Sequence, residues 1–215
     1  PVEHWTKHAQ AMGEACKLAG YKFLPDQNGE FVEGYFPVTH SNANEQRVSA
    51  AIGYLNGEAR KRSNLTISTN TQVKELLFEG TTCVGVKAVV DGKEQEFRAK
   101  EVILSSGAIH SPALLQRSGF TRNIGRSLAV HPTVKLAARF PEALNVPDDV
   151  PVHQVKEFAP HLSFGGSASN PGLVALSLLD QWRNFRTAVT DWQRMSVYYA
   201  AITSEGTGRV FSLPH

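Results

Sequence analysis

The residues of this sequence that are best suited to chemistry form a bend of small side chains between an apolar run and an expected helix. Gly107 and Ala108 follow the apolar run 101–105, and Ser111-Pro112 carries the N-cap and N1 residue types of a helix entry. Small residues at the carboxyl end of a strand let a ligand approach the main chain, and the first N–H groups of a helix can bind an anion. The bend favours a site for a phosphate-bearing cofactor, although close packing of strand on helix explains the same residues.

Histidines and cysteines offer weaker candidates for chemistry. His4 and His8 lie four residues apart on an expected helix, a spacing that could hold a metal, but an exposed helix face is the more ordinary interpretation. Cys16 and Cys83 are too few for a disulfide framework or a zinc site. We therefore expect no metal site in this chain.

Charge and hydropathy exclude several classes of partner. The net charge is only +2, so nucleic acid is a poor candidate. The basic run Arg60-Lys61-Arg62 falls at the expected end of a helix, where cations suit the negative end of the helix dipole. No apolar stretch approaches the ~20 residues of a membrane span, so we expect a soluble, cytoplasmic protein.

The elements before the bend must position it. Apolar residues recur at helical spacing over residues 3–19 and again from about 44 to 63, which predicts two helices. The β-branched run 65–69 follows the second helix and predicts a parallel strand, as in an α/β unit. An antiparallel meander is expected next, with strands at 73–78, 83–90 and 95–99. The run 101–105 then predicts a second parallel strand that leads into the bend.

A change of character follows His131-Pro132. Residues 133–140 predict an extended segment, and the prolines after it indicate a domain change. Apolar strands are predicted at 173–178, 197–202 and 209–213, which favours a second antiparallel sheet. We expect an α/β (α+β) fold divided into residues 1–40, 41–132 and 133–215.

The bend resembles the second signature of the glucose-methanol-choline (GMC) oxidoreductases. The matching residues are Gly107-Ala108, Ser111-Pro112, Leu114-Leu115 and Ser118-Gly119, in the spacing of the signature. Phe120-Thr121 departs from it, because the family usually has an aliphatic residue and a glycine there. The resemblance extends over roughly residues 35 to 140 and is carried further by the segments 46–55, 64–73 and 123–132.

The resemblance implies a fold, a cofactor and a reaction. Residues 41–132 are similar to part of an FAD-binding Rossmann-like domain with an inserted meander, whereas 1–40 and 133–215 are similar to parts of an antiparallel-sheet substrate domain. In the family, the backbone of a valine at the place of Val73 meets the adenine of FAD. We accordingly expect Val73, Gly107, Ala108 and Ser111 to bind FAD in the complete protein. That protein would oxidise the CH–OH group of a small alcohol by hydride transfer to flavin, as choline dehydrogenase-like enzymes do.

Two parts that the family's chemistry needs are absent from the sequence. No Gly-x-Gly-x-x-Gly run is present, since Gly206-Thr207-Gly208 lacks the third glycine and precedes an expected strand. The family's catalytic histidine and its His or Asn partner would lie beyond His215. We expect a central fragment with no catalytic residue, inactive when isolated.

Two alternatives stay open at this stage. The chain could be a non-catalytic binding or interaction protein derived from the same fold. It could also be one part of a longer chain. The expected fold would leave strands unpaired at an open edge of its sheet. We expect that edge to be covered by the missing segment, by a segment swapped in from a partner chain, or by a homo-oligomer contact.

Overall fold

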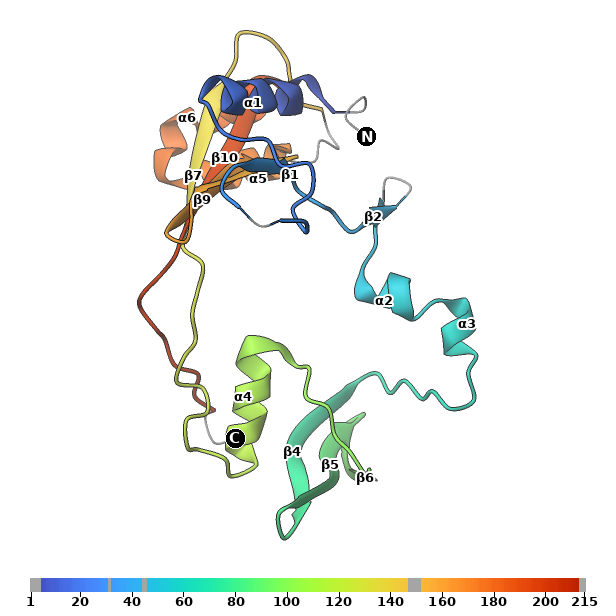
Figure 1. Ribbon diagram of the computed structural model, residues 1–215. Helices are drawn as coiled ribbons and strands as arrows, with labels where there is room; N and C mark the ends of the chain where they lie inside the picture. The colour runs from blue at the N-terminus through green and yellow to red at the C-terminus, as the bar shows by residue number, and fades with distance from the viewer. Residues whose placement is uncertain (1–4, 31, 44–45, 147–151, 213–215) are drawn as a thin grey trace. The chain divides into compact units, whose positions relative to one another are not determined.

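The computed structural model describes residues 5–30, 32–43, 46–146 and 152–212, and these form two compact units (Figure 1). The sheet unit comprises the described residues up to Asn42 together with His131–Ser204. The meander unit comprises the described residues of Ala43–Val130 and those from Glu205 onward. Each unit has its own strands, so each is described by itself.

Residues 205–212 belong to the meander unit, whereas the sequence analysis grouped them with the segment that starts at 133. Backbone hydrogen bonds explain the difference. Leu128 and Gly208 exchange N–H···O bonds of 3.1 and 2.7 Å, and the Val210 N–H donates to the Gly125 carbonyl at 2.8 Å. The strand predicted at 209–213 does not form over the described residues 209–212: the only bridge nearby is that of Gly208 with Leu128, and residue 213 lies outside the described residues.

The sheet unit is built on five antiparallel strands in the order β1-β8-β9-β10-β7 (Figure 1). The strands are β1 (Tyr35–Pro37), β7 (Thr133–Arg139), β8 (His153–Phe158), β9 (Leu162–Ser167) and β10 (Met195–Ile202). Val197 of β10 lies opposite Ala137 on one side and Ser167 on the other. The predicted extended segments 133–140 and 197–202 are confirmed.

Helices cover both faces of this sheet. On one face α1 (Lys7–Leu18) packs on β8, where Cys16, Tyr35 and Val155 form a buried cluster. The opposite face carries α5 (Pro171–Ser177) and α6 (Trp182–Thr190), and its buried cluster contains Val174 and Val197. Successive residues of a strand point to opposite faces, which is why one strand can serve two cores. Short 3₁₀ helices at Leu179–Gln181 and Trp192–Arg194 complete this side.

The strand predicted at 173–178 is wrong, because this apolar run forms α5. Its start is set by Asn170, whose Oδ1 accepts from the Leu173 N–H at 3.0 Å, and by Pro171 in the first turn. Asparagine at the N-cap followed by proline is a strong helix start. The run lies across the sheet and does not extend it.

His8 is buried, which corrects the expectation of an exposed helix face. Its Nε2 lies 2.5 Å from the Ser196 Oγ and 3.0 Å from the Tyr198 hydroxyl, both on β10. His4 lies outside the described residues. Within the described ranges no group of three His, Cys, Asp or Glu side chains could hold a metal, and no helix is long and apolar enough to cross a membrane.

The meander unit contains three antiparallel strands, as the sequence predicts. They are β4 (Thr71–Glu79), β5 (Thr82–Val90) and β6 (Lys93–Arg98), in that order. The second hairpin turns at Asp91 and Gly92, whose φ angles of 48° and 82° are those of a type I′ turn. Helix α4 (Gly107–Arg117) packs beside β4 (Figure 1).

The rest of this unit is less regular than expected. The single helix predicted from about 44 to 63 is instead a pair of two-residue strands, β2 (Asn42–Ala43) and β3 (Gln46–Arg47), followed by α2 (Ala50–Tyr54) and α3 (Gly57–Arg60). Asn56 interrupts it, since its Oδ1 accepts from the Ala59 N–H at 2.9 Å and starts a new helix. The basic run ends α3, where Lys61 pairs with Glu58 at 2.8 Å.

The two predicted parallel strands, 65–69 and 101–105, have no regular secondary structure. A strand requires hydrogen bonds to a neighbour, and no described strand pairs with either segment. The prediction of two parallel strands is therefore not met among the described residues.

His153 should make the stability of the sheet unit depend on pH. Its side chain is 2% exposed, and burial lowers the pKa of its imidazole below the usual 6.5. The unfolded chain therefore binds a proton more readily than the folded one as pH falls through 6.5, and stability is lost in that direction. We expect the free energy of unfolding by urea to fall between about pH 7.5 and 5.5.

His153→Gln should flatten this dependence, whatever it does to stability at neutral pH. The exposed His161→Gln is the matched control and should keep the wild-type slope. Equal slopes in the two variants would contradict the assignment to His153.

Gly85 should be indispensable to the meander. Its φ is +154°, and a Cβ at this position would lie 2.1 Å from the Phe97 carbonyl oxygen of β6. Gly85→Ala must therefore push β5 and β6 apart, at a cost of about 3 kcal/mol. Gly92→Ala is the control, because a Cβ there meets nothing within 4 Å and only its φ of +82° is strained, for about 1 kcal/mol. Thermal unfolding that ranks the two variants equally would refute this explanation.

Candidate functional site

The bend of small residues is open to solvent. Gly107 has a φ of +85°, in the left-handed region that favours glycine, and no atom lies within 4 Å of the place where its Cβ would stand. Gly107 and Ala108 are both exposed. Among the described residues, no side chain packs against the Gly107 position within this distance.

Helix α4 begins at Gly107, five residues earlier than an N-cap at Ser111 and N1 at Pro112 predict. Ser106 occupies the N-cap and makes no side-chain capping bond. The first N–H groups of α4 therefore lack the side-chain acceptor that usually satisfies one of them. They are available to an anionic ligand.

Ser111 and Pro112 have different roles from those expected. The Ser111 Oγ accepts from the Ser106 N–H at 3.0 Å and so closes the bend from inside the helix. Pro112 lies within α4 and has no N–H, which leaves the Ala108 carbonyl without its donor four residues on. The first N–H groups of α4 and the Ala108 carbonyl thus lack partners within the helix.

A small cavity lies beside the first turn of α4. Its volume is about 260 Å³, and it is lined by Ala108, Pro112, Gly125, Ser127, Leu128, Ala129 and Val210. Ala108 and Pro112 of the bend line it beside residues of the segments 125–129 and Val210. The bend thus borders a cavity instead of a packed interior.

Val73 lies on β4, the edge strand of the meander, opposite Ala88. The register shifts between Val73 and Glu75, so Lys74 is the extra residue of a β-bulge. Alternate backbone groups of an edge strand face away from the sheet. The backbone N–H and C=O groups of β4 that face away from β5 are donors and acceptors that a planar heterocycle can bind.

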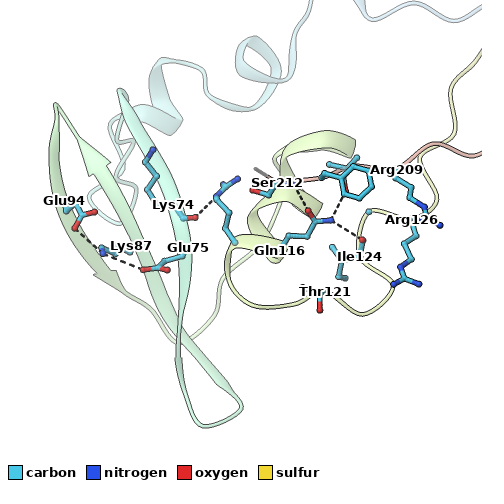
Figure 2. A pocket seen from close by; sticks show the side chains of 14 residues that line it. Lys74, Glu75, Lys87, Glu94, Gln116, Thr121, Ile124, Arg126, Arg209 and Ser212 are labelled. Carbon is cyan, nitrogen blue, oxygen red and sulfur yellow. Dashed lines mark hydrogen bonds and ion pairs between the residues drawn. The ribbon is translucent and has the colours of Figure 1, made fainter. Parts of the chain in front are cut away.

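A larger pocket of about 790 Å³ lies between the meander and the end of α4 (Figure 2). On the meander wall Lys87 lies 3.2 Å from Glu94 and 3.7 Å from Glu75. Its hydrogen bond with Glu94 raises the pKa of Lys87 above its usual value. The carboxylates and the ammonium neutralise one another on this wall, whereas Arg126 and Arg209 line the pocket farther along the chain.

Gln116 forms the opposite wall of this pocket and holds two segments that are distant in sequence. Its Nε2 donates to the carbonyls of Val210 at 2.8 Å and Ile124 at 3.2 Å, and its Oε1 accepts from the Ser212 N–H at 2.7 Å (Figure 2). The sequence analysis did not single out Gln116, which occupies a variable position of the signature. A lone amide near the end of an otherwise apolar helix is the one signal that could have found it.

Arg117 and Ser118 tie the same turn of α4 to β4. The Arg117 Nε donates to the Lys74 carbonyl at 2.8 Å, and its Nη2 lies 3.5 Å from the Val73 carbonyl. The Ser118 Oγ accepts from the Leu76 N–H at 2.8 Å and donates to the Leu114 carbonyl at 2.8 Å. The predicted site residues on β4 and at the start of α4 therefore belong to elements joined by specific hydrogen bonds.

Sequence comparisons identify the relatives of this chain. The family model described as GMC oxidoreductase matches residues 2–133, more than half of the chain. The chain is 40% identical over 116 residues to the 5-(hydroxymethyl)furfural oxidase of Methylovorus sp. (strain MP688). These aligned residues cover 54% of this chain and 22% of that protein. It is 44% identical over 128 residues to the oxygen-dependent choline dehydrogenase of Staphylococcus saprophyticus, with 59% of this chain and 23% of that protein covered.

A third relative aligns over more of the chain. An uncharacterized GMC-type oxidoreductase of Sinorhizobium fredii is 34% identical over 156 residues, which cover 70% of this chain and 31% of that protein. The chain thus spans less than a third of the length of these three relatives.

Structural comparison agrees on the fold. Pyridoxine 4-oxidase from Mesorbium loti superposes with a TM-score of 0.77 at 23% identity and covers 97% of this chain and 45% of its own. This likeness shows that the described helices and antiparallel sheets are arranged as in part of a known structure. The match over residues 2–133 and these likenesses together show that the chain belongs to the GMC oxidoreductases, a family of FAD-dependent enzymes.

Proposed function

We propose that the complete protein oxidises the CH–OH group of a small alcohol by hydride transfer to FAD, and that this chain supplies part of its FAD domain and part of its substrate domain. The observation that carries the proposal is the open bend at Gly107 and Ala108, within the segment that the family model matches. Oxidation of alcohols is the class of reaction named for relatives such as choline dehydrogenase. The sheet unit is the part that we assign to the substrate domain.

The residues present fit FAD. The left-handed φ of Gly107 and the empty space before it leave room for a ligand against main chain. The uncapped N–H groups at the start of α4 suit the negative charge of a pyrophosphate. Ser111 holds the Ser106 backbone in the bend, and Val73 presents backbone groups of an edge strand to the adenine. Val73, Gly107, Ala108 and Ser111 would thus bind the cofactor or shape its site.

These residues would bind FAD and orient it, and none of them is placed to move a proton during the reaction. When bound, FAD supplies the acceptor for the hydride. Removing the hydroxyl proton of an alcohol needs a general base within hydrogen-bond reach of that hydroxyl. The family's histidine for this task has no counterpart in the 215 residues, and neither does the Gly-x-Gly-x-x-Gly turn that binds the pyrophosphate. The chain on its own therefore lacks both the base and the main phosphate loop.

The isolated chain should not turn over alcohols, whereas the product of the whole reading frame should. The test incubates each with FAD, choline or a benzylic alcohol, and an electron acceptor, and follows reduction of the acceptor. Turnover by the isolated chain above a no-protein control would defeat the first expectation. A whole-frame protein that binds FAD without oxidising any alcohol would instead favour a non-catalytic role.

Gly107→Ala should weaken FAD binding by the whole-frame protein, because alanine disfavours a φ of +85° and would move the bend. Gly119→Ala is a matched control at the other end of α4, with a φ of +92° and nothing within 4 Å of the added Cβ. Both variants should lose about 1 kcal/mol of stability. Only Gly107→Ala should reduce affinity in a flavin titration, and an equal loss in both would show that the bend does not touch FAD.

A further inference from the structure

The strand segment that carries Val73, the proposed adenine contact, is irregular. Val73 and Lys74 lie at the bulge of β4, where the regular pairing with β5 is broken. A bulge leaves its extra residue unpaired and bends the strand, so its carbonyl directions depend on whatever else binds them. The structure supplies one such group, the guanidinium of Arg117.

Arg117 is suited to fixing the carbonyl of the bulge residue Lys74, to which its Nε donates at 2.8 Å, while its Nη2 lies 3.5 Å from the Val73 carbonyl. Its planar guanidinium carries five N–H donors in a rigid fork. Hydrogen bonds from an ionised donor are about twice as strong as neutral ones. The side chain is half-buried, and no carboxylate in the described part of the chain pairs with it. Its donors are therefore directed to backbone and not to a competing acid.

Ser118 fixes the neighbouring part of the same strand edge. Its Oγ accepts the Leu76 N–H at 2.8 Å, so α4 engages both an N–H and two carbonyls along one side of β4. Helix α4 also begins at Gly107, the bend of the proposed site. The two proposed contact points for FAD, one on β4 and one at the start of α4, are thus connected through the last turn of a single helix.

We propose that Arg117 is a positioning residue for the adenine half of FAD. It fixes the Lys74 carbonyl next to Val73 and so sets the course of the β4 backbone at the proposed adenine contact, and it does not itself contact the flavin half. This inference rests on the proposed function, because it takes Val73 as the adenine contact. If Arg117 only held α4 against β4, its loss would weaken the binding of both halves of the cofactor alike.

The test uses the apoprotein of the whole reading frame and three ligands: FAD, ADP for the adenine half, and FMN for the flavin half. Arg117→Met keeps much of the side-chain length and removes every donor. Loss of the charge-assisted hydrogen bonding to the backbone should lower the affinity for FAD and for ADP about 10-fold and leave the affinity for FMN unchanged. Arg122→Met is the control, since Arg122 is an exposed arginine of the following loop and loses the same charge.

The outcomes separate the two proposals. If the wild type binds no FAD, the proposed function fails and this inference fails with it. If the wild type binds FAD but Arg117→Met binds FAD and ADP as tightly as Arg122→Met, only the inference is overturned. Equal losses of affinity for ADP and FMN also overturn it, because they indicate that Arg117 only holds α4 against β4. Should Arg117→Met not fold, Arg117→Lys replaces it: this variant keeps the charge but loses the planar fork of donors, and a smaller loss confined to FAD and ADP is the supporting result.

Discussion

The meander unit depends on hydrogen bonds from side chains in the last turn of α4 to backbone groups elsewhere. Gln116 binds the segments around Ile124 and Val210, Arg117 binds the bulge of β4, and Ser118 binds the N–H of Leu76. Contacts from side chain to backbone specify position without requiring particular side chains in the partner segments. One helical turn can therefore fix a strand, a loop and a distant segment of the chain at once.

The sheet unit is organised differently, by burial on both faces of one sheet. Val155 and Val197 are almost fully buried on opposite faces, under α1 on one side and α5 and α6 on the other. His8 and His153 lie among these apolar contacts, and Gly13 makes room for the His153 ring, since a Cβ there would lie 3.1 Å from the imidazole. Polar aromatic side chains thus serve as packing groups in this core.

Local signals predicted the parts of the fold that local interactions determine. The hairpins of the meander follow from Gly80 and from Asp91-Gly92, and α1 follows from a regular apolar face. Residues 65–69 and 101–105 were predicted as strands from composition alone, but pairing is a non-local property and no described strand supplies it.

Residues 173–178 show the reverse error, because the cap at Asn170 outweighed an apolar run that is ambiguous by itself. The bend at Gly107 was singled out from its small residues, whereas Arg117 was missed because its contact with β4 depends on a bulge 43 residues earlier in the chain.

The segment 101–105 has a consequence for handling the protein. Ile103 is 81% exposed, between Val102 and Leu104, which are half-buried. An extended apolar stretch with open main-chain donors and acceptors is a template on which other chains can add as β-strands. Preparations of this chain alone should self-associate as concentration rises, and a charged residue at position 103 is the substitution that would keep the molecules apart.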